Sequence, residues 1–294
     1  MTIAHRLAVI TAVATLVLIV AGGLVTNTGS ALAVPDWPTT FGHNMFLYPP
    51  SGMVGGVLFE HGHRLLGSLV GLLTVLLAVA CWRADGAIRW LGVLAVVAVV
   101  AQGILGGMRV VLLKDVLGIV HAAVAQAFFA LIVAIAFLTS PAAARRPMVA
   151  LPGSLAIGAL AVTYGQIVLG ALLTHSGWVE AHLAGAVFVY ALVPTVASRV
   201  RRAGDDVAAR TAVVLLSLLG AQLALGVGAL VARLAPGGLP APAVLALALP
   251  AAHRLIGSAI LGAVAVLALR CAAPRPRWRC LWTVSRPAGP HSTW

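Results

Sequence analysis

The chain consists largely of long, uninterrupted runs of apolar residues, separated by short connections that carry most of its charges. A membrane-spanning helix needs about 20 apolar residues, and these runs lack the alternation of a transmembrane strand. In lipid, continuous helices satisfy every backbone amide internally. The pattern therefore predicts an all-α integral membrane protein with eight transmembrane helices. The expected spans are Arg6–Thr26, Phe59–Trp82, Trp90–Leu113, Val116–Thr139, Leu151–Leu173, Ala181–Ser198, Thr211–Arg233 and Leu247–Leu269.

The composition agrees with a protein whose main solvent is lipid. Hydrophobic residues make up 61% of the 294 residues and charged residues only 9%. Soluble domains carry about a quarter charged residues. So few charges cannot form a water-facing surface, which excludes a soluble globular protein.

The net charge of +12 indicates contact with anionic lipid and not with nucleic acid. The arginines fall in alternate connections and near the end of the chain, the pattern of basic cytoplasmic loops. It predicts a multi-pass protein of the bacterial plasma membrane with both termini in the cytoplasm. The cysteines fall on the same, reducing side, so no disulfide is expected. The residues concerned are Arg83, Arg89, Arg145, Arg146, Arg199 to Arg210 and Arg270 to Arg286, with Cys81, Cys271 and Cys280.

The longest connection, Asn27–Gly56, is expected on the outer side of the membrane. Its four prolines exclude a long helix, and its aromatic residues make it amphipathic. Two interpretations remain open: an interfacial cap lying on the membrane, or a loop with ordinary aromatic anchors. The residues concerned are Pro35, Pro38, Pro49 and Pro50, with Trp37, Phe41, Phe46 and Tyr48.

An internal repeat divides the helices into hairpins. The pattern Q-x-x-L-G occurs at residues 102–106, 166–170 and 222–226, each time on an odd-numbered helix that precedes a helix with a histidine. The first hairpin lacks the glutamine but carries His63, and its segment 63–68 nearly matches segment 253–258. We expect two pseudo-repeated four-helix bundles, residues 1–145 and 146–294, although transporters also contain such repeats.

Four histidines occupy the first turns of the even-numbered helices and are therefore expected at one depth near the outer face. Each comes from a different helix among small apolar residues, which leaves room for a flat macrocycle between helices. Zinc and copper sites favour cysteine, carboxylates or closely spaced histidines, whereas neutral imidazole is an axial ligand of haem iron. One such histidine alone would more often hydrogen-bond across helices; four in register favour haem. They are His63, His121, His182 and His253.

Glu60 is a carboxylate well inside an apolar run, on the helix face of His63. It either acts beside a haem or neutralises Arg64, and no equivalent acid precedes His253. Arg64 and Arg254 are candidate partners of haem propionates, or else they extend to the membrane interface. Weaker candidates are the remaining histidines, among which His61 points about 200° away from His63. They are His5, His43, His61, His175 and His291.

At these residues the sequence resembles the haem A synthase family. The combination of T-G-S, P-D-W-P and E-H-x-H-R carries most of the resemblance. The C-terminal half matches mainly through its histidines. The matching segments are Gly22–Ser30, Pro35–Pro38, Glu60–Arg64 and Gln102–Gly107, together with His121, His182 and His253.

The resemblance implies a membrane haem-dependent oxidoreductase that converts haem O to haem A by oxidising a porphyrin methyl group to a formyl group, through two successive hydroxylations. It implies that His63 and His121 hold the substrate haem O in the N-terminal half, with Glu60 catalytic. His182 and His253 would hold the iron of a haem B cofactor in the C-terminal half. An electron donor, not identified by the sequence, and haem O synthase are the implied partners besides the lipid bilayer.

One departure from the family concerns the outer loop. Many members carry two cysteines there, where this chain has Val34 and Thr40. A redox-active thiol pair is therefore not expected in this loop. Two other functions fit the composition: a b-type cytochrome that transfers electrons from quinol, and a haem-free secondary transporter. A prenyltransferase is disfavoured, because Asp205 and Asp206 lie in a basic connection.

Overall fold

The computed structural model describes residues 2–84, 86–145, 153–234 and 243–272. Within them, eight helices are long and apolar enough to cross a membrane, which confirms the predicted fold class. The predicted boundary between the halves, Arg146, Cys280 and the arginines beyond residue 272 lie outside the described residues. The helices are α1 (Ile3–Asn27), α2 (Gly56–Trp82), α3 (Ala87–Leu112), α4 (Asp115–Leu138), α5 (Gly153–Ser176), α6 (Val179–Arg201), α7 (Asp206–Leu234) and α8 (Ala243–Ala272).

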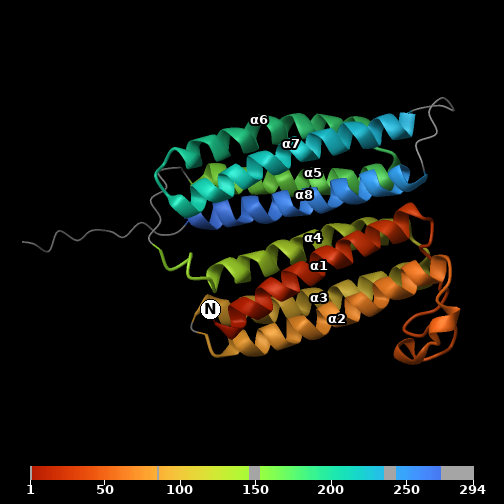
Figure 1. The fold of residues 1–294 in the computed structure, drawn as a ribbon. Coiled ribbons are helices and arrows are strands. Elements are labelled where there is room, and N and C mark those ends of the chain that lie inside the picture. Colours follow the sequence, from red (N-terminus) through yellow and green to blue (C-terminus); the bar gives the residue numbers. More distant parts are fainter. Residues whose placement is uncertain (1, 85, 146–152, 235–242, 273–294) are drawn as a thin grey trace, which may run out of the picture.

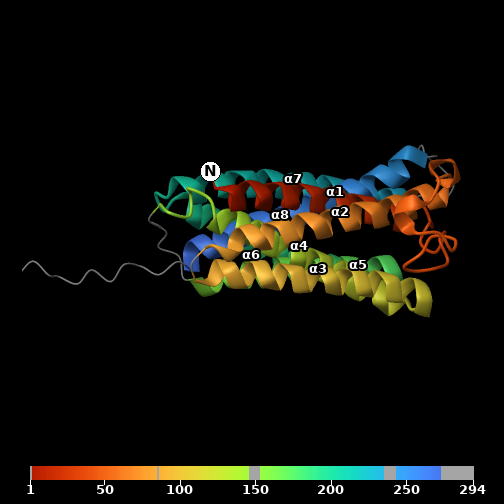
Figure 2. The same ribbon diagram turned by 90° about the horizontal axis from the view of Figure 1, so that it is seen from below.

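The helices pack as two groups of four (Figure 1). In the first group each of α1 to α4 contacts two neighbours, closing a ring through α1 and α4; in the second, α5 and α8 close the ring. Each group has its own apolar core. Seen from below, the helices of both groups run roughly parallel or antiparallel to one long axis (Figure 2). That the two groups repeat one structure remains a prediction.

The two groups meet through α1 and α8, and through α4 with α5 and α8. Near one end Arg254 of α8 donates a hydrogen bond to the backbone carbonyl of Gly23 in α1, at 3.0 Å. At the other end Arg270 forms an ion pair with Asp205, at 3.0 Å, and donates to the carbonyl oxygens of Ala142 and Arg145. Buried arginines therefore join the groups at both ends of the bundle.

Large apolar side chains cover much of the outward surface of the helices. Exposed Val79 and Leu72 on α2, Val97 on α3 and Phe188 on α6 are examples. Such a surface is unfavourable in water and suited to lipid. The buried residues include small and polar side chains, among them Ala8, Thr11, Thr74 and Gln102.

Candidate haem site

The four histidines of the repeat lie in two pairs. The ring centres of His63 on α2 and His121 on α4 are 6.5 Å apart. Those of His182 on α6 and His253 on α8 are 6.3 Å apart. Each pair thus lies inside one four-helix group, and all four side chains come from the N-terminal parts of even-numbered helices, which share one end of the molecule (Figure 1).

These spacings fit a haem iron between two imidazoles. With metal–nitrogen bonds of about 2 Å, two imidazoles on opposite sides of one metal have ring centres about 6 Å apart. In addition, the Nδ1 atoms of His63, His121 and His253 are buried without a hydrogen-bond partner. Unpaired buried polar atoms are rare and call for a missing partner. The residues present therefore fit the group that the resemblance implies.

A glycine on the preceding helix lies against each imidazole. A Cβ atom built on Gly22 would lie 3.0 Å from Cε1 of His63, and one on Gly106 would lie 3.2 Å from Cε1 of His121. The corresponding distances are 3.3 Å from Gly170 to His182 and 3.0 Å from Gly226 to His253. A side chain at any of the four positions would press on the imidazole, so glycine sets the approach of the two helices there.

The glutamines of the repeat contact the histidines that follow them. Nε2 of Gln102 donates to the carbonyl oxygen of His121 at 3.0 Å, and Nε2 of Gln166 to that of His182 at 2.9 Å. Nε2 of Gln222 lies 3.1 Å from Nε2 of His253. Sequence analysis found these glutamines only as a repeat; their contacts depend on how the hairpins pack.

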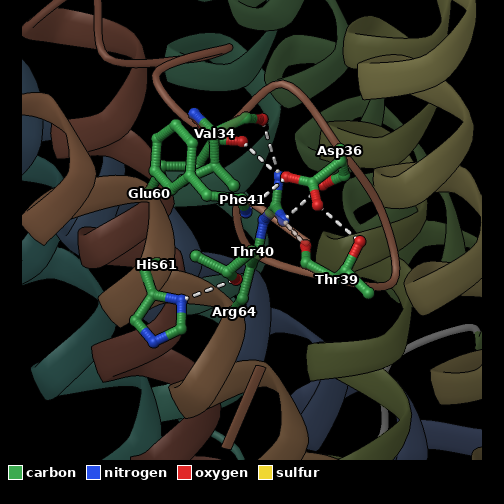
Figure 3. A network of polar contacts seen from close by, with 8 residues as sticks. All are labelled: Val34, Asp36, Thr39, Thr40, Phe41, Glu60, His61 and Arg64. Carbon is green, nitrogen blue, oxygen red and sulfur yellow. Dashed lines mark hydrogen bonds and ion pairs between the residues drawn. The ribbon is translucent and has the colours of Figure 1, made fainter. Parts of the chain in front are cut away.

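Glu60 and Arg64 form the ion pair considered from the sequence, and together they hold the outer loop (Figure 3). Oε1 of Glu60 accepts from Arg64 at 2.8 Å, and Oε2 accepts from the backbone N–H of Val34 at 2.9 Å. The Arg64 guanidinium also donates to the carbonyl oxygens of Val34, Asp36 and Thr39. Its four terminal N–H groups are thus engaged within the protein.

His61, a weak candidate from the sequence, has a structural part in the same region. It is almost completely buried, its Nδ1 lies 3.0 Å from Oγ1 of Thr40, and its ring packs on that of Tyr48 with centres 5.2 Å apart. Val34 and Thr40, which stand where many family members have cysteines, are both fully buried. In this chain they connect the loop to α2 through Glu60 and His61.

Asp36 organises the tip of the loop. Its carboxylate accepts hydrogen bonds from the Thr39 hydroxyl and from the backbone N–H groups of Phe41 and Gly42. Desolvation opposes ionisation, but these hydrogen bonds outweigh it and lower the pKa of Asp36 to about 2. Two short 3-10 helices, Met45–Leu47 and Pro50–Gly52, are the only helical turns of this loop, as the prolines predicted.

The loop also reaches α3 beside the first histidine pair. Gly107 lies directly under the ring of Trp37, where a Cβ atom would be 2.2 Å from Cδ2. The preceding residue, Gly106, faces His121. Leu32, Pro35 and Trp37 line a pocket with Val110 and Leu113 of α3's outer end. The loop therefore folds onto the bundle next to the candidate site, whereas its placement on the membrane surface remains a prediction.

Sequence analysis also missed Arg109 in the last turn of α3. A Cβ atom on Gly118 would lie 2.9 Å from Nε of Arg109 and 3.1 Å from Cε1 of His175. Arg109 and His175 therefore both lie against Gly118 of α4, three residues before His121. A single arginine at a helix end has no distinguishing sequence pattern, so only the packing of α3, α4 and α5 marks it.

Comparison with known proteins identifies the first part of the bundle. Residues 53–179 match the family described as "Cytochrome oxidase assembly protein". This part of the chain is similar to that family, and the match covers less than half of the chain. It includes Glu60, His63 and His121, whereas His182 and His253 lie beyond it.

The relatives in the haem A synthase family come from bacteria. The chain is 39% identical over 110 residues to the heme A synthase of Shouchella clausii, covering 36% of this chain and 35% of that protein. It is 32% identical over 105 residues to that of Geobacillus kaustophilus, covering 34% and 32% respectively. The matched part thus spans about a third of the length of these relatives. The resemblance seen in the sequence is confirmed for this region.

Proposed function

We propose that the chain is a haem A synthase, a membrane oxidoreductase that oxidises a porphyrin methyl group of haem O to the formyl group of haem A. The observation that carries the proposal is the coincidence of the family match with the His63–His121 pair. The matched region contains both histidines, and their 6.5 Å spacing suits an iron between them. Haem iron, when bound, supplies the redox chemistry of the reaction.

We assign the two histidine pairs to two different haems. His63 and His121 hold the substrate haem O, because this pair lies in the family-matched region and beside Glu60 and the capping loop. His182 and His253 would hold haem B, which would supply electron transfer from an unidentified donor. The second pair is supported by the same spacing and the same flanking glycines as the first.

Glu60 is the proposed catalytic carboxylate, one helical turn from His63. Both of its oxygens are engaged, with Arg64 and with the backbone of Val34. These bonds orient the carboxyl group and hold the loop that excludes water from the outer side of the site. Arg64 therefore acts here through the loop, and Arg254, on the equivalent turn of α8, is the better candidate for a haem propionate.

The proposal includes a location and partners. The basic connections face the cytoplasm and both termini lie on that side of a bacterial plasma membrane. Both histidine pairs then lie near the outer face. Haem O synthase is the proposed source of the substrate.

The deciding experiment co-expresses the chain with a source of haem O and identifies the extracted haems by chromatography. Haem A is expected with the natural chain and is lost in both His63→Ala and His121→Ala. A b-type cytochrome would retain haem B without producing haem A, and a transporter would contain no haem. Either result contradicts the proposal.

The same assay tests the carboxylate. Glu60→Gln is expected to fold, bind haem and accumulate haem O or its alcohol intermediate, because the amide keeps the size but not the charge of the side chain. The matched control is Glu180→Gln, an exposed carboxylate at the start of α6, which should leave haem A formation unchanged. Normal haem A levels in Glu60→Gln would remove Glu60 from the mechanism, and loss of the protein without a stalled haem would leave it a structural role only.

A further inference from the structure

The glutamine of the repeat has a counterpart at every histidine except His63. Each glutamine stands four residues before the glycine that faces the imidazole: Gln102 before Gly106, Gln166 before Gly170 and Gln222 before Gly226. Four residues before Gly22, which faces His63, stands Leu18. Residues four apart share one face of a helix, so Leu18 occupies the glutamine position on α1.

The contacts of the other positions support this equivalence. Each glycine of the four positions lies against an imidazole, and the three glutamine side chains contact the histidines that follow them. The three glutamines also share a second feature: Oε1 of each is buried and accepts no hydrogen bond. Each of the three sites therefore has a glutamine on its histidine, at the backbone carbonyl of His121 and His182 and at the imidazole of His253, and the fourth site has none.

The glycines that follow the histidines on the even-numbered helices also have different neighbours. In α8, a Cβ atom on Gly257 would lie 3.3 Å from Nε2 of Gln222, and in α6 one on Gly185 would meet Oε1 of Gln166. In α2, Gly67 occupies the position of Gly257 in the matching H-R-L-x-G-S segments, and nothing lies within 4 Å of a Cβ there. Among the described residues, a Cβ atom at Gly67 therefore meets no glutamine, in contrast to one at Gly257.

We propose that Gln102, Gln166 and Gln222 are positioning residues that fix three of the four haem ligands, and that His63, which lacks one, is the ligand that leaves the iron most readily. This inference rests on the proposed function and extends it. The apolar side chain of Leu18 cannot donate a hydrogen bond to the turn of α2 that carries His63, and the described polar contacts of this turn are those of Glu60 and Arg64 with the loop. The substrate site is then the one at which iron can accept an external ligand, while the His182–His253 site stays closed.

Carbon monoxide, which binds ferrous haem only where an axial position opens, is the probe. The full chain in detergent is loaded with haem B to two haems per chain, reduced, and titrated with carbon monoxide while the absorption spectrum is recorded. In the natural chain we expect only the haem of the His63–His121 site to react. Leu18→Gln should lower the carbon monoxide affinity of this site about five- to tenfold, the effect of one added hydrogen bond on the closed state.

Two further variants keep the test decisive. Leu18→Met, of similar size and without an amide, should behave as the natural chain. Gln166→Met should make the second haem reactive, which gives an answer even if Leu18→Gln fails to bind haem. A role of the glutamines in helix packing alone would change stability without changing which haem reacts.

The outcomes separate this inference from the proposed function. A chain that binds two haems whose reactivity is unchanged in Leu18→Gln and Gln166→Met would overturn the inference and leave the haem A synthase proposal intact. A chain that takes up no haem at the His63–His121 site would overturn both.

Discussion

Single glycines decide how closely each imidazole of the candidate site can approach the neighbouring helix. Gly22, Gly106, Gly170 and Gly226 all lie within van der Waals distance of a histidine ring. Residues of this kind are common where transmembrane helices meet, because small side chains let backbones come together. Here they serve a more specific purpose, since each one faces a side chain proposed to hold iron.

A pair of substitutions on α7 tests this role. Gly226→Ala places a methyl group 3.0 Å from Cε1 of His253, whereas Gly220→Ala on the same helix meets nothing within 4 Å. Both changes raise the helix propensity equally, so they differ only in this contact. Displacing the imidazole from its rotamer should speed haem loss from the second site about three- to tenfold in Gly226→Ala.

The measurement is transfer of haem from the detergent-solubilised protein to an excess of a haem-free globin, followed by absorbance. Gly220→Ala should transfer haem at the natural rate. Equal rates in the two variants would show that His253 is not held against Gly226 in the loaded protein.

At the scale of elements, the outer loop is a folded cap and not a simple connection. Polar contacts with the first turns of α2 join it to the helix that carries His63 (Figure 3). Trp37 packs on Gly107 and so joins the loop to α3. Few of these contacts are local in sequence: Val34 lies 26 residues from Glu60. Any movement of the loop is therefore coupled to the helix that carries the most weakly held ligand.

The loop should be sensitive to acid through Asp36. Its pKa is about 2 in the folded protein against an ordinary 3.8. A lowered pKa means that the carboxylate stabilises the loop fully above pH 3.8, and that this contribution disappears as the pH falls from there towards 2. Hydrogen exchange of residues 34–43 should consequently be constant between pH 7 and 4, after correction for intrinsic rates, and rise below pH 4.

Asp36→Asn provides the comparison for that experiment. The amide cannot accept all the hydrogen bonds that the carboxylate accepts, so the loop should exchange faster already at pH 7 and lose the additional step below pH 4. Peptides from the middle of α3 act as an internal control for general unfolding. A step of equal size in both proteins would assign the acid sensitivity to another group.

At the scale of the whole molecule, two four-helix groups are joined by helices α1, α4, α5 and α8 and by arginines at both ends. The two histidine pairs come from the N-terminal parts of the even-numbered helices, which begin at the same end of the bundle (Figure 1). Charged residues in lipid are costly unless paired, and Arg254 and Arg270 are each bound to backbone carbonyls of the other group or its connection. The two arginines therefore stabilise the contact between the two four-helix groups, and their charges lie near the ends of the bundle.

The orientation of the molecule follows from its charges and is open to direct test. In a variant without Cys81, Cys271 and Cys280, a cysteine introduced at Ala203 lies in a basic connection, and one at Ser51 lies in the outer loop. A membrane-impermeant maleimide added to intact cells should label Ser51→Cys and not Ala203→Cys. Permeabilised cells should give labelling at both positions, and the reverse result in intact cells would invert the topology.

Much of the fold could be predicted from the sequence because the length of an apolar run is a local property. All eight spans were found, and helix ends differed by a few residues where the described helices continue into polar ends, as at Arg201 of α6. The candidate ligands could also be predicted, since their positions repeat along the chain. Their roles as iron ligands, and that of Glu60 in catalysis, remain predictions.

What the sequence alone determined, then, is membrane insertion, the number of helices and the depth of the four histidines, all of which depend on hydrophobicity and spacing along one chain segment. Only the tertiary structure decided which histidines face each other, which glutamine contacts which histidine, and that His61 and Glu60 hold the loop. These contacts join residues 16 to 71 positions apart in the chain. They depend on how neighbouring helices pack, because the direction of a side chain between two helices is set by the crossing of those helices and not by the residues that flank it.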